Sequence, residues 1–281
     1  MVATFHRKRD VGVRRVLTYL VLLLGAAISL FPFYWLVSGS LKPASELFRW
    51  PPTFLPSVLT LDAYRYLWQT MDVPRVMLNS IIVTVSEVGL NICFSGLVAY
   101  ALAKMRIPGK RYLLWLILAL MMIPFQIMMI PLFLQIHRLG LLDTYAGIIL
   151  PGAVSSFTIF LLHQAFMTIP NDYIDAALVD GANHFSILTR IAVPMVMPLI
   201  LTTVLINFYW SWNGFLWPFI VIQHDEMATL PVALARYQTF MENRWDAILA
   251  GATITSLPIV ILYLVIQRRF VESLTMTGLK G

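Results

Sequence analysis

Six long, almost uncharged runs of apolar residues constrain what this chain can fold into more than any other feature of its sequence. The runs lie near residues 16–38, 78–103, 112–136, 146–168, 195–222 and 248–267. A helix of about 20 apolar residues crosses the roughly 30 Å hydrocarbon core of a bilayer. The alternating strands of about ten residues that build a membrane barrel do not occur in these runs. The sequence therefore predicts an all-α membrane protein with six transmembrane helices.

The composition agrees with this class. Charged residues make up 12% of the chain and hydrophobic residues 59%, and the mean hydropathy is +0.78. Charged residues alone form about a quarter of an ordinary soluble domain. The net charge of +6 suits loops that lie beside anionic headgroups, so it does not indicate a nucleic-acid partner.

The distribution of Lys and Arg predicts the orientation. Thirteen of the 20 basic residues fall on one side of the predicted membrane, in segments 7–15, 104–111, 190 and 268–280. By the positive-inside rule both termini are cytoplasmic, and loops 39–76 and 223–247 face outward. The first run continues into an aromatic cluster at 31–36, so we expect a retained span and not a cleaved signal peptide.

The segment 169–194, between the fourth and fifth runs, differs from the other loops. Asn171 can cap a helix, and Gly181 can end it with a positive φ. A second short helix follows over 183–190, and Pro194 is expected to begin the next span. The sequence therefore predicts a compact knob of two short helices on the cytoplasmic side.

The charge of this knob indicates what it contacts. It carries Asp172, Asp175 and Asp180 against Arg190 alone. A basic face would favour lipid, and an acidic face favours a protein partner. An amphipathic pair that merely rests on the headgroups is the alternative.

A motif within this segment resembles a family signature. Asp175-Ala176-Ala177 is followed after three residues by Gly181 and after nine more by Ile191-Ala192-Val193-Pro194. Inner-membrane permeases of ATP-binding cassette importers carry Glu-Ala-Ala, three residues, Gly, nine residues, then Ile-x-Leu-Pro, and this chain is similar except for Asp and Val. The resemblance implies a pair of coupling helices that dock on an ATPase subunit. The implied coupling residues are Asp175, Ala176, Ala177, Asp180, Gly181, Ile191 and Pro194.

Further segments resemble the carbohydrate branch of these permeases, the maltose and glycerol-phosphate types. They are Ile123-Pro124, Ile130-Pro131, 139–145, 150–152, 211–213, 215–218, 229–232 and the 267–272 tail with Lys280-Gly281. Gly214 departs from the branch, which commonly has an acid there, so a role that needs an acid at this position is in doubt.

The resemblance implies a division of the chain. Residues 1–76 would hold an N-terminal cytoplasmic segment, the first transmembrane helix and an outer loop. Residues 77–270 would form the permease core of five transmembrane helices with coupling loop 169–194, and 271–281 a cytoplasmic tail.

The resemblance also implies the partners and the mechanism. A second homologous permease subunit, two ATPase subunits and an extracytoplasmic substrate-binding protein would complete an importer of a sugar or related polyol in the bacterial cytoplasmic (inner) membrane. Transport would proceed by alternating access. ATP and Mg would bind to the ATPase subunits, because this chain lacks a P-loop: its Gly109-Lys110 is followed by Arg111.

A few residues inside the spans are candidates for the substrate pathway. A charged Glu87 is unfavourable in hydrocarbon, so we expect its side chain to face the bundle interior or a watery cavity, as a functional group or as a structural hydrogen-bond partner. Side chains that could bind hydroxyls or stack on sugar rings are Asn91, Asn207, Trp212 and Asn213, with interhelical packing and an interfacial aromatic belt as alternatives. Cys93 is expected to be a small core residue, and we expect no metal or other cofactor on this chain.

Two other function classes are less consistent with the sequence. A stand-alone ion-coupled secondary carrier usually has inverted repeats and several intramembrane ionisable residues, whereas Glu87 is the one acid here and no repeat is evident. A membrane enzyme or redox anchor lacks its ligand set, since His163 is the only histidine in a span.

Overall fold

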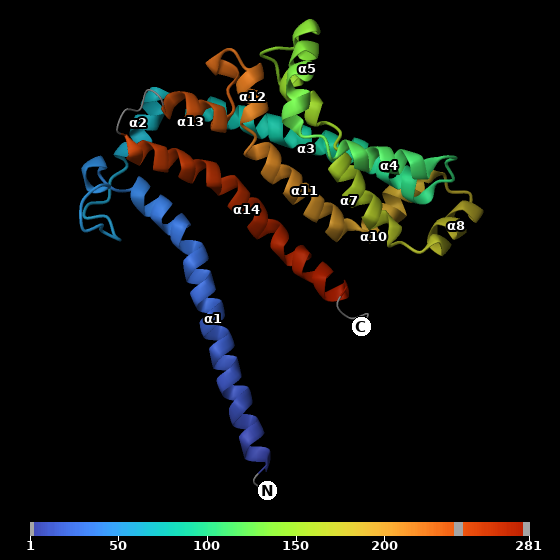
Figure 1. Cartoon of the computed structure of the whole chain (residues 1–281), viewed down its shortest axis with the longest axis horizontal. Helices are drawn as coiled ribbons and strands as arrows, with labels where there is room; N and C mark the ends of the chain where they lie inside the picture. Colours follow the sequence, from blue (N-terminus) through green and yellow to red (C-terminus); the bar gives the residue numbers. More distant parts are fainter. Residues whose placement is uncertain (1–2, 239–243, 278–281) are drawn as a thin grey trace. The chain divides into compact units, whose positions relative to one another are not determined.

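The computed structural model describes the backbone of residues 3–238 and 244–277, with side chains for 14–238 and 244–267. Its longest helices are α1 (Ala3–Ser40), α3 (Val73–Lys104) and α14 (Trp245–Thr277) (Figure 1). Each contains a stretch long and apolar enough to cross a membrane. Helical backbone therefore continues past residue 271, where the cytoplasmic tail was expected to begin, and residues 278–281 lie outside the description.

Three further apolar segments are bent helix pairs. α4 (Lys110–Leu120) and α5 (Phe125–Arg138) meet at 96° next to Pro124, which cannot donate a backbone hydrogen bond. α6 (Tyr145–Ile149) with η2 (Leu150–Gly152) meets α7 (Ser156–Met167) at 47°. The segment His184–Met195 meets α11 (Met197–Trp212) at 84°.

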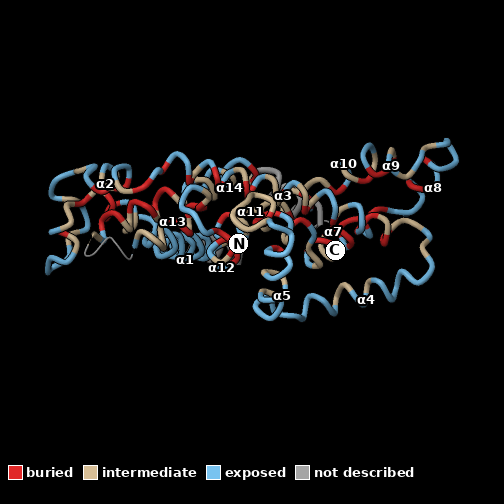
Figure 2. The backbone as a smooth tube through the Cα atoms, turned by 90° about the horizontal axis from the view of Figure 1, so that it is seen from above, coloured by how far each residue is buried: buried red, intermediate tan, exposed pale blue. Residues whose placement is uncertain are grey.

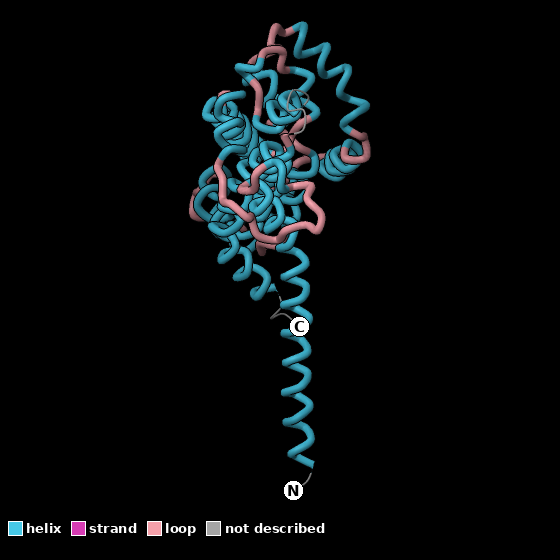
Figure 3. Tube along the Cα trace, turned by 90° about the vertical axis from the view of Figure 1, so that its left-hand side faces the viewer, coloured by secondary structure: helices cyan, strands magenta, loops and turns pink. Residues whose placement is uncertain are grey.

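These elements confirm the all-α prediction, since the described residues form helices and loops without a strand (Figure 3). Three continuous helices and three bent pairs account for six apolar segments. The expected single run over 195–222 was wrong in detail. α11 ends at Trp212, and a separate helix α12 (Leu216–Val221) follows.

The remaining described helices are short. They are η1 (Ala44–Glu46), α2 (Asp62–Thr70), α8 (Asn171–Val179), α9 (His184–Ile187), the π-helix η3 (Leu188–Ala192), α10 (Val193–Met195), η4 (Asp225–Met227) and α13 (Leu230–Gln238).

The chain forms two compact units. One comprises residues 1–71 and 238–254. Within it the Glu46 carboxylate accepts hydrogen bonds from the hydroxyls of Thr53 (2.5 Å) and Ser57 (2.6 Å) and from the Ser57 N–H (3.1 Å). The bonds from Ser57 and Thr53 hold the pKa of the Glu46 carboxyl below its usual value. The loop after α1 is thus organised around one acid.

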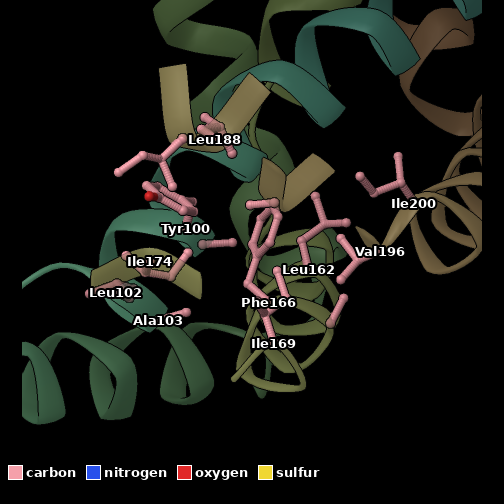
Figure 4. Packing of buried hydrophobic residues seen from close by; sticks show 14 of the residues in the cluster. Tyr100, Leu102, Ala103, Leu162, Phe166, Ile169, Ile174, Leu188, Val196 and Ile200 are labelled. Carbon is pink, nitrogen blue, oxygen red and sulfur yellow. The ribbon is translucent and has the colours of Figure 1, made fainter. Parts of the chain in front are cut away.

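The second unit comprises residues 72–237 and 255–281, described to residue 277. In it α3 packs along α7 and α11 (Figure 1). Their buried side chains form one apolar cluster, in which the rings of Tyr100 and Phe166 meet edge to face at 5.6 Å beside Leu162 (Figure 4). Burial of this cluster, at about 25 cal/mol per Å² of apolar surface, fixes the three helices as a scaffold.

Other surfaces of the second unit stay exposed. Figure 2 colours α4 and α5 mostly as exposed, and α4 has no buried residue. Cys93 is exposed on α3, so its expected place in the core was wrong. The residue lies on the opposite side of α3 from the buried Asn91 and Ser95, which turn toward α7 and its preceding turn.

Candidate functional site

The first candidate region is the helical knob formed by α8 and α9. α8 begins after Pro170, whose φ of −59° suits a helix entry. The expected capping role of Asn171 was wrong, because this residue lies inside the helix and its Oδ1 accepts a hydrogen bond from Lys104 Nζ at 2.9 Å. The cap of α9 is Asn183, whose Oδ1 accepts from the Ser186 N–H at 2.8 Å.

Gly181 ends α8 as predicted. Its φ is +82°, and its N–H donates to Leu178 O at 3.1 Å. The next N–H, of Ala182, donates to Ala177 O at 2.9 Å, so the last carbonyls of the helix are satisfied. A Cβ at position 181 would meet no atom within 4 Å. The glycine is therefore required by the backbone conformation and not by space.

The knob is anchored on one face and free on the other. Ile174, Ala177 and Ile187 are buried in the cluster of α3 and α7. Asp175 and Ala176 are exposed. Among the other predicted coupling residues, Asp180 and Gly181 are exposed and Ile191 is half-buried against the same cluster. The Asp-Ala-Ala motif thus contributes one alanine to the core and leaves its acid outward.

The way in which the knob joins the next span differs from the expectation. Pro194 is exposed in the three-residue helix α10, and the span helix begins only at Met197, after a break at Val196. The π-helix η3 precedes it. A π-turn is rare and has no simple sequence signal, which explains why the sequence predicted a plain helix there.

The second candidate region is a cavity of about 720 Å³ in the second unit, lined by both apolar and polar side chains. Its walls are formed mainly by α3, η2, α7, α11 and α12. Its polar lining consists of Ser80, Thr84, Glu87, Asn91, Ser155, Asn207, Ser211 and Thr229, and its indoles are Trp210, Trp212 and Trp217.

Glu87 is half-buried and lines this cavity, a position that was expected for an acid inside a span. Its Oε2 accepts a hydrogen bond from Ser211 Oγ at 2.6 Å. Its Oε1 lies over Gly152, where an added Cβ would come within 1.8 Å. The position of the carboxylate therefore depends on one hydroxyl partner, Ser211 in α11, and on the absence of a Cβ at Gly152 in η2.

The two candidate asparagines line the cavity and also join helices. Asn91 Nδ2 donates to Gly152 O at 2.6 Å. Asn207 Oδ1 accepts from Thr158 Oγ1 at 3.2 Å, and its Nδ2 donates to Thr203 O at 2.9 Å. The same two side chains therefore form hydrogen bonds between helices and contribute polar groups to the lining of the cavity.

The candidates Trp212, at the end of α11, and Asn213, directly after it, lie in different surroundings. Trp212 is 2% exposed, stacks on Phe208 at 5.7 Å and donates from Nε1 to Thr255 O at 2.8 Å. It is held in the protein and does not form an exposed interfacial belt. Asn213 is exposed, donates to Tyr209 O and does not belong to the described lining of the cavity.

Sequence reasoning missed several lining residues as site residues. Ser211 and Gly152 were noticed only as parts of family-like segments. A serine or a glycine inside an apolar run does not by itself indicate that the residue lines a cavity. Gly214 also lines the cavity, and a Cβ there would lie 2.9 Å from Ser211 O. A larger residue at position 214 would therefore require the end of α11 to shift.

The charge of the cavity limits its chemistry. No Lys or Arg belongs to the described lining, and Glu87 is its one ionisable group. Over the described chain, no three His, Cys, Asp or Glu side chains come close enough together to hold a metal ion. The lining is suited to a neutral solute with hydroxyl groups, which can bind amides and hydroxyls and stack on indoles.

A multi-pass helical domain with a cavity between its helices, lined partly by polar groups, and an exposed knob at one end has the architecture of a membrane transport subunit. Residues 91–275 match the family of binding-protein-dependent transport system inner membrane components, and the chain belongs to this family. It is therefore a multi-pass inner-membrane permease component of a transport system, as the sequence predicted, and a stand-alone carrier is not favoured.

Curated relatives are similar over almost their whole length. The arabinooligosaccharides transport system permease protein AraQ of Halalkalibacterium halodurans is 37% identical over 259 residues, which cover 91% of this chain and 93% of the relative. The lactose transport system permease protein LacG of Rhizobium radiobacter is 31% identical, with 92% and 94% covered. The sn-glycerol-3-phosphate transport system permease protein UgpE of Escherichia coli is 30% identical, with 92% and 95% covered.

A solved structure has the same fold. It is that of a bacterial ABC transporter involved in the import of the acidic polysaccharide alginate, with a TM-score of 0.80 and 27% identity, covering 93% of this chain and 98% of that chain.

Proposed function

We propose that this chain is the permease subunit of an ATP-driven importer that moves a neutral sugar or a related polyol into the cytoplasm. The observation that carries the proposal is the cavity, whose described lining combines amides, hydroxyls, indoles and further apolar side chains with one acid and no cation. A phosphate or uronate substrate would need compensating positive charge in a site of low dielectric. Relatives named for arabinooligosaccharide and lactose transport support a sugar.

The knob is proposed to couple this subunit to ATP hydrolysis. Its exposed acids, Asp175 and Asp180, are available to a protein partner, and Ile174 and Ile187 fix it to the scaffold. Lys104 Nζ also donates to Ile169 O at 2.6 Å, just before α8. A force applied to the exposed face would therefore be transmitted to α3 and α7 through packed side chains and would not be lost in a loose loop.

The complete transporter is proposed to contain a second homologous permease subunit, two ATPase subunits that bind ATP and Mg, and an extracytoplasmic binding protein that delivers the sugar. Both termini and the knob would lie in the cytoplasm, as the distribution of Lys and Arg indicates. ATP binding can shift the cavity between outward and inward access only through contacts that differ between the two states.

Reconstitution tests this function. The chain would be purified with the subunits that accompany it, placed in proteoliposomes, and assayed for ATP-dependent uptake of a neutral oligosaccharide, a sugar phosphate and a uronate oligomer. We expect uptake of the neutral sugar only, and only with ATP and a binding protein. Uptake that persists without ATP, driven by an ion gradient, would establish the carrier alternative and contradict the proposal.

The coupling role is tested with a matched pair of charge reversals. Asp175→Lys lies in the motif, and Asp172→Lys changes another exposed acid about one turn earlier on the same helix. We expect Asp175→Lys to reduce sugar-stimulated ATP hydrolysis much more than Asp172→Lys. Equal effects would mean that only the net charge of the knob matters.

A further inference from the structure

A second cavity, of about 590 Å³, lies where α3 ends, α4 begins and α7 ends. The charged part of its lining is Lys104, Lys110 and Arg111, and none of its described lining residues is acidic. Three cations without an acid around a partly enclosed space produce a positive potential that attracts anions. None of these residues lines the 720 Å³ cavity that contains Glu87.

His163 adds an unsatisfied polar group to this cavity. The side chain belongs to the lining, yet the residue is only 7% exposed. Its Nδ1 has no hydrogen-bond partner within the described part of the chain. A buried ring nitrogen without a partner is unfavourable, so the wall of the cavity holds an uncompensated polar atom next to the cations.

Two of the cations are available to a ligand. Lys110 Nζ makes one long hydrogen bond, of 3.4 Å, to Met105 O. Arg111 is exposed and forms no ion pair with any described residue. Lys104, in contrast, is held by Ile169 O and Asn171 Oδ1. A bound anion would therefore be contacted by Lys110 and Arg111, with Lys104 contributing charge from the wall and His163 lying in the wall beside them.

The rest of the wall is apolar. Leu102, Ala103 and Ile169 line the cavity and belong at the same time to the buried cluster (Figure 4), so this wall is rigid. Leu114 and Met167 complete an apolar side next to the cations. Cations beside apolar groups at the end of a membrane span match a ligand with a charged head and a hydrocarbon body.

We propose that this cavity binds a phosphate-bearing anion, namely the headgroup of an anionic phospholipid. Soluble phosphate has the same head chemistry and is distinguished in the test. The site lies next to α8, because Lys104 lines the cavity and also holds Asn171 at the start of that helix. An occupied site would therefore stiffen the junction between the knob and the scaffold.

Native mass spectrometry on the full chain, in the complex in which it is purified, tests the proposal. The protein in detergent would be titrated separately with phosphatidylglycerol, phosphatidylcholine and inorganic phosphate. The test variant is Lys110→Gln with Arg111→Gln, both at exposed positions where the fold does not depend on the side chain. The matched control is Arg106→Gln, an exposed cation in the loop just before α4 that is not in the lining.

We expect phosphatidylglycerol to bind more tightly than phosphatidylcholine, and the double variant to weaken that binding about tenfold or more, since two cations near the headgroup are lost. Arg106→Gln should change binding by less than about twofold. In chain labelled with ¹⁵N-histidine, the His163 ring signal should shift with phosphatidylglycerol and not with phosphatidylcholine.

Saturable binding of inorganic phosphate with the same variant dependence would support the site and identify a soluble ligand. Equal binding of both lipids with no binding of phosphate would overturn it, as would an Arg106→Gln effect as large as that of the double variant. If the double variant loses an accompanying subunit while lipid binding is unchanged, the cations contact a protein and the proposal fails.

Discussion

The carboxylate of Glu87 shows at the scale of single residues how a polar group is accommodated inside an apolar bundle. It receives one hydroxyl hydrogen bond, from Ser211, and occupies the space that a side chain at Gly152 would fill. The sequence predicted that Glu87 faces inward, because a charge in hydrocarbon is costly. It could not predict Gly152 as the neighbour, because that pairing depends on how the turn η2 lies against α3.

Gly152→Ala should therefore move the Glu87 carboxylate. The new Cβ would fall 1.8 Å from Oε1, so the flexible side chain must rotate away from Ser211. We expect loss of that hydrogen bond, destabilisation by about 1 kcal/mol, and reduced transport. Thermal unfolding and uptake would be measured beside Gly89→Ala, where a Cβ meets no atom within 4 Å.

A double-mutant cycle separates this effect from general damage. Glu87→Ala combined with Gly152→Ala should be no less stable than Glu87→Ala alone, since no carboxylate remains to be displaced. Additive losses of stability would show that Gly152 acts independently of Glu87.

Asp143 gives a pH-dependent prediction outside the spans. Burial acts to raise its pKa, but hydrogen bonds from the His224 ring and the backbone N–H groups of His224 and Gln223 outweigh burial and lower the pKa. A carboxyl whose folded pKa is depressed stabilises the fold above its unfolded pKa of about 3.9, and this stabilisation is lost as the pH falls further.

Asp143→Asn is the matched substitution, because the φ of residue 143 is +58° and asparagine tolerates that region. We expect the variant to be less stable than the wild type at pH 6, and the difference to shrink as the pH falls below about 3.9 and through the lower pKa of the folded state. Denaturant unfolding of the solubilised chain across this pH range measures both. A constant difference at all pH values would contradict the assignment.

At the scale of elements, the knob was well predicted and the bends were not. Gly181 ends α8 with positive φ because few other residues tolerate that conformation, which is a local property readable from sequence. The 96° turn beside Pro124 and the 84° turn at Val196 lie inside apolar runs. Hydropathy indicates whether a segment lies in the membrane but not how its helix axis is directed, so each run was expected to be one transmembrane helix without a stated bend.

The knob provides a clean test of backbone conformation. At Gly181 an added Cβ meets open space, so any cost of a substitution arises from its φ of +82°. Gly181→Val should cost about 1–2 kcal/mol and misdirect α9. Gly181→Asn, which tolerates positive φ, should stay close to the wild type.

Sugar-stimulated ATP hydrolysis of the reconstituted complex is the measurement. We expect it to fall in Gly181→Val with the chain still inserted and to persist in Gly181→Asn. Normal activity in the valine variant, with a full set of ATPase subunits, would mean that α9 does not need its present direction for coupling.

At the scale of the whole molecule, the distribution of charge predicts an orientation that hydropathy cannot supply. The cluster of basic residues at 104–111 lies next to α8, since Lys104 contacts both Ile169 and Asn171. The knob and this basic loop must therefore be on the same side of the membrane. From the positive-inside rule we expect that side to be the cytoplasm and the loop after α1 to face outward.

Cysteine labelling tests this orientation. Cys93 would first be changed to alanine, because it is exposed and would itself react. Val58→Cys, in the loop after α1, and Val179→Cys, at the end of α8, are suitable probes since the native residues are 63% and 87% exposed and apolar. The neighbouring Ser57 is less suitable as a labelling position, because its N–H and its hydroxyl both donate hydrogen bonds to Glu46. In intact cells an impermeant maleimide should label position 58 and reach position 179 only after the inner membrane is opened. Labelling of position 179 from outside would reverse the orientation and remove the knob from any cytoplasmic ATPase.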